Sequence, residues 1–394
     1  MASKYSVGRF QHLLLPLFLT FCFGGAFYTY FKPTIIWTLC SDAVVSSDKV
    51  CFDKCFNVFK EFFLKNSTIT STPNCTLANK QPLITKPSVM EENHDHDTII
   101  LLWSWPFGFT FQGETCDSEY GIKGCHITDD RRQYYKAHGV MFHHRDIGGD
   151  LPNLLNMPRP PHQKWVWMNM ESPDNTPRWT VTDDLFNLTA NYRRDSDIWV
   201  PYGRIIDISE KDKPFTIPPK DKLVCWVVSN WNPNYSRVKY FNELSKYIKI
   251  EAYGRSFNRY INDEDYKATL SSCKFYLSFE SSTHKDYFTE KLFNPMKVGT
   301  VPVVLGPPRE NYEEFLPADS FIHVDDFKSS QELAEHLKFL DQNQEAYEHY
   351  FTWRQHFTAK RSRFGLEHAC RICDHIRKHK GYRVFRGLSK WYWD

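Results

Sequence analysis

The fold of this chain is decided by one stretch, Leu223-Val-Cys-Trp-Val-Val-Ser-Asn-Trp-Asn-Pro-Asn-Tyr-Ser-Arg237. It begins as a continuous apolar run, passes through a polar turn and leads into a helical pattern at residues 238–247. Strands that are apolar on both faces and alternate with helices are typical of parallel sheets covered by helices. Ligands of such sheets bind beyond the carboxyl ends of the strands, so the polar turn is a candidate binding site.

Apolar runs of similar length recur through the chain. Helical patterns such as residues 290–298 and 331–340 lie between them, and a Pro-rich segment at 214–219 marks a domain junction. We therefore expect an α/β protein with two Rossmann-like, doubly wound domains that face a cleft. The other apolar runs lie at residues 98–103, 139–142, 165–168, 274–279, 301–305 and 321–324.

The first 97 residues differ from the rest. Residues 10–31 carry no Asp, Glu, Lys or Arg, and a helix of this length crosses a bilayer core of roughly 30 Å. Because Lys4 and Arg9 precede the run, residues 1–9 are expected in the cytoplasm and the body in the lumen, as for a type II signal anchor. A cleavable signal peptide is the alternative. In residues 32–97 the apolar residues follow no sustained helical or strand period, so this segment is interpreted as a stem.

The body is expected to divide into residues 98–220 and 221–355, with residues 356–394 returning to the first domain. Six of the eleven cysteines lie in this body, an even number that suits three disulfides in an oxidising lumen. Zinc or redox chemistry at the closely spaced C-terminal pair is the alternative. The expected bridges are Cys116–Cys370, Cys125–Cys373 and Cys225–Cys273.

Charge and sequons both agree with a luminal body. The formal net charge is only +2, with acidic and basic residues spread along the chain, which argues against a nucleic-acid partner or a polybasic membrane patch. Any charge on a ligand must then be met by local groups. Four Asn-x-Ser/Thr sequons predict N-glycosylation at Asn66, Asn74, Asn187 and Asn234.

A carboxylate stands where one apolar run ends. Glu171 follows this run and precedes Ser172-Pro173, in a segment that Pro keeps extended. Burial beside Trp165, Trp167 and Met170 should raise the pKa of Glu171 and suit it to take a proton from an alcohol. A loop carboxylate paired with a nearby arginine is the alternative.

Polar and cationic side chains follow the apolar runs of the second half. Ser229 and Asn230 lie in the turn before a helix, and Arg237 could form a bidentate contact with a diphosphate. A plain surface role for this arginine is the alternative. Glu290 and Lys291 begin another helix, where a carboxylate could accept from sugar hydroxyls and an ammonium could neutralise a phosphate.

Two short motifs suggest metal ions. Asp195-Ser-Asp197 imitates the Asp-x-Asp of metal-dependent nucleotide-sugar transferases, although the two arginines before it offer ion pairs. His143 and His144 form a second candidate. Adjacent residues of a strand point to opposite faces, so an acceptor-binding or structural role is favoured for this pair.

Several longer motifs support one another. The main ones are Val228-Ser-Asn-Trp-Asn-Pro to Arg237, and Phe275-Tyr-Leu-Ser-Phe-Glu to Tyr287-Phe-Thr-Glu-Lys291. Together they resemble the signature of the α-1,3-fucosyltransferases, glycosyltransferase family 10, and the resemblance covers nearly all of residues 98–394. Further support comes from Trp103-Ser-Trp-Pro-Phe-Gly, His143-His-Arg-Asp-Ile, Tyr192-Arg-Arg-Asp-Ser-Asp and Val303-Val-Leu-Gly-Pro.

The resemblance implies a GT-B architecture, an inverting single displacement from GDP-fucose, and no required metal cofactor, although a divalent ion could stimulate the reaction. By position, Glu171 matches the general base of the family. Arg237 and Lys291 match contacts to the donor phosphates, and Tyr287 and Glu290 match other donor contacts. The segment that influences acceptor choice contains His144, Arg145 and Asp146.

Two positions depart from the family pattern. Ser281 stands where the family usually has Asn, so one donor hydrogen bond is expected to be shortened, bridged by water or lost. Phe109 stands where related sequences place a polar residue, which bears on acceptor preference.

The expected function is transfer of fucose from GDP-fucose to O3 of GlcNAc in Galβ1,4GlcNAc (Lewis x type) termini of glycoproteins and glycolipids, in the Golgi membrane. Residues 98–220 would bind the acceptor and residues 221–355 the GDP-fucose. The sequence leaves open whether the chain forms a homodimer. One alternative is a non-catalytic luminal glycan-binding protein on the same fold. Another is a metal-dependent transferase that uses Asp195 and Asp197.

Overall fold

The computed structural model describes residues 97–112, 115–209 and 214–394. The predicted cytoplasmic tail, transmembrane helix and nearly all of the stem lie outside these residues, as do the sequons at Asn66 and Asn74. Within the described ranges, every helix is too short or too polar to cross a bilayer.

The first sheet has six parallel strands in the order β2-β1-β3-β4-β5-β6. Every residue of β3 and β4 is buried, as their continuous apolar sequences predict. The strands β2, β5 and β6 were not predicted, because runs of two to four residues carry too little pattern. The strands are β1 (Thr98–Leu102), β2 (Cys125–Thr128), β3 (Gly139–His143), β4 (Lys164–Asn169), β5 (Leu188–Asn191) and β6 (Ile198–Trp199).

The second sheet has five parallel strands in the order β12-β11-β10-β8-β9. Its strands are β8 (Lys222–Val227), β9 (Ile250–Tyr253), β10 (Cys273–Phe279), β11 (Val301–Leu305) and β12 (Ile322–His323). The helices of this part of the chain are α6 (Ser236–Leu244), α7 (Asp263–Ser272), α8 (Glu290–Val298), α9 (Arg309–Glu313), α10 (Ser330–Gln342) and α11 (Gln344–His349).

Both sheets share one topological feature. The second strand of each lies outside the first, so the winding direction changes between β1 and β3 and between β8 and β10. Ligands of doubly wound sheets bind beyond the carboxyl ends of the strands at such switch points. The two parallel sheets and their helices give the GT-B-like α/β fold that the sequence predicts.

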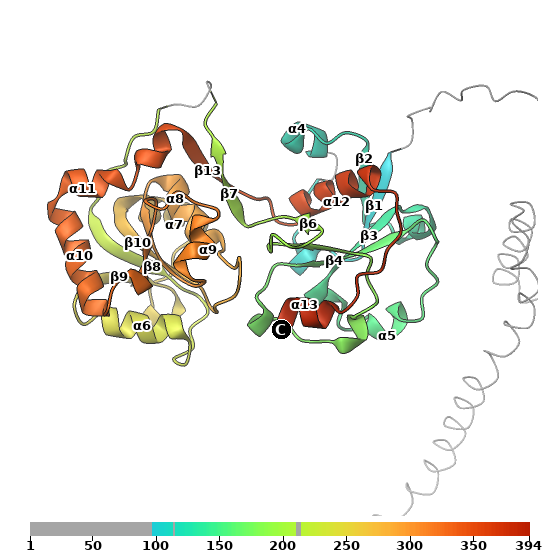
Figure 1. Ribbon diagram of the computed structural model, residues 1–394, viewed down its shortest axis with the longest axis horizontal. Helices are drawn as coiled ribbons and strands as arrows, with labels where there is room; N and C mark the ends of the chain where they lie inside the picture. The colour runs from blue at the N-terminus through green and yellow to red at the C-terminus, as the bar shows by residue number, and fades with distance from the viewer. Residues whose placement is uncertain (1–96, 113–114, 210–213) are drawn as a thin grey trace, which may run out of the picture. The chain divides into compact units, whose positions relative to one another are not determined.

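The C-terminal part of the chain packs on the first sheet. Helix α12 (Leu366–Lys378) contacts β1, β2 and β3, and it lies beside these strands in Figure 1. A two-stranded antiparallel sheet pairs β7 (Gly203–Asp207) with β13 (Phe357–Arg361). The remaining helices are α4 (Cys116–Tyr120), α5 (Leu151–Leu154) and α13 (Leu388–Trp393).

Three disulfides connect these elements. Cys116–Cys370 and Cys125–Cys373 join α4 and β2 to α12, and Cys225–Cys273 joins β8 to the start of β10. All three expected pairings are present. The sulfur atoms that zinc or redox chemistry would need are therefore used in structural bonds.

Short 3-10 helices occupy several connections. Two of them follow the strands at the switch point of the first sheet: Pro106–Gly108 comes after β1, and His144–Ile147 comes after β3. Phe107 in the first of these has a φ of 53°, a left-handed conformation that is uncommon for a residue with a large side chain. The others lie at Arg131–Lys136, Pro173–Asn175, Thr180–Thr182, Arg255–Phe257, Val324–Asp326 and Thr352–Gln355.

Candidate active site

Glu171 lies two residues beyond the end of β4 and is half-buried. Its backbone N–H donates to Asn169 Oδ1 over 3.3 Å. Burial raises the pKa of Glu171, while the positive charges of Lys291 and Arg145 oppose this shift. A carboxylate in this environment can bind a proton at a higher pH than an exposed one, as a general base for an alcohol requires.

Lys291 lies in the first turn of α8, whose N-cap is Thr289. Its ammonium donates to Thr289 Oγ1 over 2.9 Å and to Glu290 Oε1 over 3.1 Å. Burial opposes the charge of Lys291, but Glu280 and Glu290 outweigh this effect and raise its pKa. The side chain is therefore a fixed cation that can hold an anionic group of a ligand.

Glu280 was not predicted as a site residue. It follows β10 directly and its side chain is only 1% exposed. Its carboxylate accepts from the backbone N–H of Thr289 over 2.7 Å and from the Thr289 hydroxyl over 3.1 Å. Burial raises the pKa of Glu280, and the charge of Lys291 counteracts this shift. An acidic residue at the end of an apolar strand was the signal that could have identified it.

Arg237 lies in the first turn of α6 and is 3% exposed, which contradicts a surface role. Its guanidinium donates to the carbonyl oxygen of Asn230 and lies 5.4 Å from the ring of Tyr235. Burial lowers the pKa of Arg237, whereas Glu280 raises it. Within the described part of the chain, its Nε atom has no hydrogen-bond partner. A buried donor without a partner is uncommon in a folded protein, so this atom supports Arg237 as a candidate for ligand contact.

The other predicted donor residues lie at the same switch point. Ser229 and Asn230 are exposed in the turn after β8, and Ser281 is half-buried after β10. Since β8 and β10 are parallel neighbours, both turns lie at the same, carboxyl end of the strands. Tyr287 is 4% exposed and its ring lies 5.2 Å from that of Tyr192.

The segment after Glu171 contacts the segment before α8. Ser282 donates through its hydroxyl to Ser172 Oγ over 2.7 Å. Asn175 Nδ2 donates to Ser281 Oγ over 3.1 Å. These bonds connect the loop that carries the carboxylate with the loop that leads to Lys291. The site is thus assembled from both sheets.

The structure corrects the predicted role of His144 in acceptor binding. Its side chain is fully buried, with Nδ1 accepting from Trp167 over 2.8 Å and Nε2 within 2.8 Å of the Pro177 carbonyl oxygen. Its ring stacks on Trp179 at 4.2 Å, and burial lowers the pKa of His144 to about 4. With both nitrogens engaged inside the domain, His144 supports the loop and cannot contact an acceptor.

Arg145, Asp146 and Phe109 lie around the switch point of the first sheet. Arg145 is exposed and lies 4.9 Å from the ring of Phe107. Asp146 accepts from the backbone N–H of Phe107 over 2.8 Å and lies 2.6 Å from His143 Nδ1. Phe109 is 65% exposed, so its ring is available to a ligand. Asp146 mainly holds the loop, whereas Arg145 and Phe109 face solvent.

The Asp-x-Asp motif is occupied by structural contacts. Asp195 pairs with Arg193 at 2.8 Å. Asp197 accepts from the Thr189 backbone over 2.8 Å and pairs with Arg383. No cluster of three or more His, Cys, Asp or Glu side chains suited to a metal ion occurs in residues 97–112, 115–209 and 214–394.

One predicted glycosylation site, Asn187, is inaccessible in the folded domain. The side chain of Asn187 is fully buried and its amide donates to the Arg383 carbonyl oxygen over 2.6 Å. Its Oδ1 accepts from Trp165 N and from Arg159. The folded domain has no room for a glycan at this position. Asn234, by contrast, is exposed.

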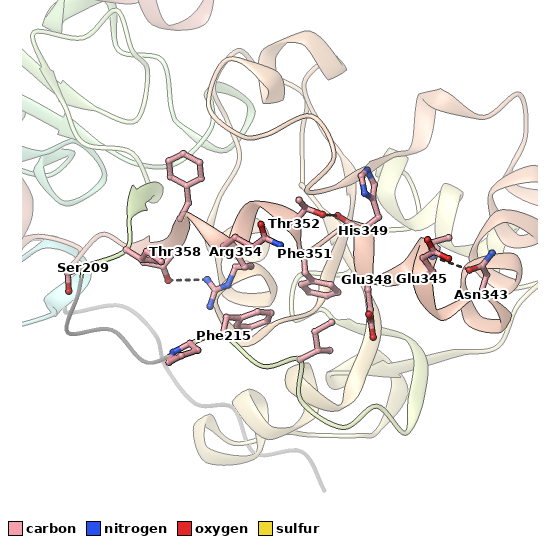
Figure 2. A pocket seen from close by; sticks show the side chains of 16 residues that line it. Ser209, Phe215, Asn343, Glu345, Glu348, His349, Phe351, Thr352, Arg354 and Thr358 are labelled. Atoms are coloured by element: carbon pink, nitrogen blue, oxygen red, sulfur yellow. Dashed lines mark hydrogen bonds between the residues drawn. The ribbon is translucent and has the colours of Figure 1, made fainter.

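A cavity of about 1280 Å³ lies apart from all of these residues. Figure 2 shows its lining, in which Arg354 donates to Thr358 Oγ1 over 3.0 Å and lies 4.2 Å from the Phe215 ring. None of the predicted donor or acceptor residues lines it. We therefore place the candidate site at the strand ends, where the charged groups converge.

A half-buried carboxylate beyond β4 and two cations in the first turns of α6 and α8 give an α/β site with the groups that a glycosyltransferase acting on an anionic donor needs. Two family models match the chain: "Fucosyltransferase, N-terminal" over residues 95–203 and "Glycosyltransferase family 10 (fucosyltransferase) C-term" over residues 217–391. The chain belongs to glycosyltransferase family 10 and is a fucosyltransferase.

Two relatives in sequence agree with this membership. The chain is 47% identical to 4-galactosyl-N-acetylglucosaminide 3-alpha-L-fucosyltransferase 9 of Mus musculus, over 100% of both chains. It is 38% identical to 3-galactosyl-N-acetylglucosaminide 4-alpha-L-fucosyltransferase FUT3 of Pan troglodytes, over 92% of this chain and 98% of the relative. A solved α1,3-fucosyltransferase with GDP-fucose is 17% identical, with a TM-score of 0.48, over 74% of this chain and 94% of that one. The motifs had also suggested a likeness to vertebrate fucosyltransferase 9, which the first relative confirms.

Proposed function

We propose that this fucosyltransferase moves fucose from GDP-fucose to O3 of GlcNAc in Galβ1,4GlcNAc termini of glycoproteins and glycolipids. One observation carries the proposal: the loop of the half-buried Glu171 is hydrogen bonded to the loop that leads to Lys291, through Ser172 to Ser282 and Asn175 to Ser281. The printed name of the mouse relative, with a 4-galactosyl-N-acetylglucosaminide fucosylated at position 3, supports the same acceptor.

In the proposed reaction, the Glu171 carboxylate takes the proton of the GlcNAc 3-hydroxyl. The hydroxyl oxygen forms a bond to fucose C1 while the bond from C1 to the GDP oxygen breaks, and GDP leaves with the bonding electrons. One displacement inverts the anomeric centre, so a β-linked donor gives an α-linked product. General-base assistance of this kind contributes roughly 10²- to 10⁴-fold in rate.

The donor is proposed to bind at the switch point of the second sheet. Arg237 and Lys291 would neutralise the diphosphate, and their positive charge would stabilise the negative charge that grows on departing GDP. Because these cations meet that charge, the proposed reaction needs no bound divalent metal. Further donor contacts are proposed for Ser229, Asn230, Ser281, Tyr287 and Glu290.

The acceptor is proposed to bind beside Arg145 and Phe109. The exposed ring of Phe109 offers a flat apolar surface to the C–H face of a sugar, and Arg145 offers charged donors to its hydroxyls. The positive charge of Arg145 opposes the raised pKa of Glu171, which supports a position for Arg145 close to the proposed base. The membrane anchor at residues 10–31 and a Golgi location, with the body in the lumen, complete the proposal.

The base assignment is tested with Glu171→Gln in the full-length chain. We expect GDP to bind as in the wild type while kcat falls by about 10²- to 10⁴-fold. The matched control is Asp184→Asn, an exposed carboxylate of the same region, which should keep full activity. Near-normal turnover by the folded Glu171→Gln protein would refute the assignment of Glu171 as the general base.

The reaction itself is tested with GDP-fucose and N-acetyllactosamine. Release of GDP coupled to fucosylation of the acceptor is expected, and EDTA should leave the rate within about twofold. Binding of the glycan without GDP release would indicate a lectin instead. Loss of activity in EDTA that is restored by a divalent ion would indicate a metal-dependent reaction.

A further inference from the structure

The last residues of the chain contact the backbone of the proposed base, Glu171. Helix α13 ends at Trp393, one residue before the C-terminal Asp394, and Tyr392 within it is 2% exposed. The hydroxyl of Tyr392 donates to the backbone carbonyl oxygen of Glu171. A residue near the chain terminus is therefore hydrogen bonded to the same residue that carries the reactive carboxylate.

The Tyr392 hydroxyl also accepts hydrogen bonds. Asn169 Nδ2 donates to it over 3.1 Å, and the hydroxyl of Tyr192 lies 3.3 Å away. Asn169 in turn accepts from the Glu171 backbone N–H over 3.3 Å. Both backbone polar groups of Glu171 are thus bound, one to Asn169 and one to Tyr392, so the peptide units on both sides of its Cα are fixed.

Three further contacts hold α13 in place. Trp393 Nε1 donates to the Thr176 carbonyl oxygen over 3.0 Å. The backbone N–H of Ser389 donates to Asp183 Oδ1 over 2.6 Å. Arg178 forms two hydrogen bonds with Asp394, of 2.7 and 3.2 Å. Thr176, Asp183 and Arg178 all come from the segment that follows Glu171 in the sequence. The C-terminal helix and this segment therefore support one another.

From this arrangement we infer that Tyr392 is a positioning residue for catalysis, and that the C-terminal helix sets the orientation of the Glu171 carboxylate. Tyr392 does not touch a substrate in this account, because it is buried behind the loop. The inference rests on the proposed role of Glu171. It goes beyond that role by making turnover depend on a hydroxyl near the end of the chain.

The test is Tyr392→Phe, which keeps the ring and removes the hydroxyl. We expect kcat to fall on the order of 10- to 100-fold, since small misplacements of a catalytic group have effects of this size. The KM for GDP-fucose should stay within about twofold, because the donor cations lie in α6 and α8 of the second domain. Tyr135→Phe, an exposed tyrosine of the same domain, is the control and should behave like the wild type.

The pH profile separates positioning from simple loss of folded protein. A loosened loop lets water reach Glu171, so its pKa should fall and the acid limb of kcat should move to lower pH in Tyr392→Phe. A smaller folded fraction would instead lower kcat equally at every pH. Unchanged kcat, or a uniform decrease without a shifted limb, would refute the inference.

A second pair of variants leaves the Tyr392 hydroxyl intact. Asp394→Arg should lower kcat by up to about fivefold, which is what an exposed ion pair can contribute. Arg178→Asp combined with Asp394→Arg restores opposite charges and should regain the loss. No effect of the first change, or no recovery in the double variant, would count against the role of the C-terminal helix.

Glu171→Gln is measured in parallel. If it stays active, the base assignment fails. An inactive Glu171→Gln protein beside a Tyr392→Phe protein of normal activity rejects only the positioning role.

Discussion

The Lys291 ammonium lies 3.5 Å from Glu280 Oε2, and the two side chains are 26% and 1% exposed. The carboxylate is thus buried beneath a cation that still reaches solvent. Glu280 also accepts from the backbone N–H and the hydroxyl of Thr289, so it fixes the first turn of α8 and the charge of Lys291 together. This pair connects the end of β10 to the proposed donor site.

Glu280→Gln should weaken the donor site without a direct contact to the donor. The neutral amide no longer stabilises the ammonium, so the pKa of Lys291 falls and its side chain becomes more mobile. We expect the KM for GDP-fucose to rise by about tenfold and the melting temperature to fall, because a buried charge loses its partner. Steady-state kinetics and thermal unfolding measure both effects. Glu310→Gln, which changes an exposed glutamate of α9, should change neither.

Arg237→Lys should show whether the shape of the guanidinium matters. Lysine keeps the charge but lacks the planar fork that suits two phosphate oxygens. We expect the Kd of GDP to rise by about tenfold, the loss of roughly one charged hydrogen bond. Isothermal titration of GDP measures it. Lys239→Ala, on the exposed side of the same helix, serves as the control. Equal affinity of Arg237→Lys and wild type would exclude a bidentate contact.

The pH dependence of kcat follows from the environment of Glu171. Burial raises its pKa above the ordinary 4.5, and only the deprotonated form can accept a proton. The rate should therefore be full above this raised pKa and should fall as the pH decreases through it. Measurements of kcat in stopped assays across the acidic pH range determine the acid limb of the pH profile. An acid limb at or below pH 4.5, with the protein still folded, would contradict a buried base.

Glycan mapping should distinguish two of the sequons. Asn234 is exposed and is expected to carry a glycan, so Asn234→Gln should remove one glycan mass with little change in stability. Asn187→Gln should change no glycan mass but should destabilise the fold by about 1–3 kcal/mol, because buried groups lose their partners. Mass spectrometry and denaturant unfolding provide the two readouts. A glycan found on Asn187 would overturn the buried position described for this residue.

Apolar patterning predicted much of the fold but few of its short elements. The apolar runs that became β3, β4, β8, β10 and β11 were visible because strands covered on both faces are apolar throughout. The strands β2 and β9 are only partly buried, so their sequences contain neither a continuous apolar run nor a clear alternation of apolar and polar residues. The sequence alone could not establish how those strands pair.

The site was predicted in part for the same reason. Glu171, Arg237 and Lys291 follow apolar strands or begin helices, so their place at the strand ends could be expected. The role of His144 could not, because its motif resembles a surface cluster while its ring is enclosed by Trp167 and Trp179. Burial of a polar side chain depends on distant residues that a local pattern does not contain.

The amino-acid sequence by itself determined the class of fold, the cysteines that bridge, and the chemical types placed at the ends of the strands. These properties follow from local apolar patterning and from residue identity. Only the tertiary structure decided which groups meet: Glu280 beneath Lys291, and Tyr392 against Glu171, 221 residues apart in the chain. Contacts over such separations arise when the C-terminal helix packs back on the first domain, and side-chain packing, unlike periodicity, cannot be read from neighbouring residues.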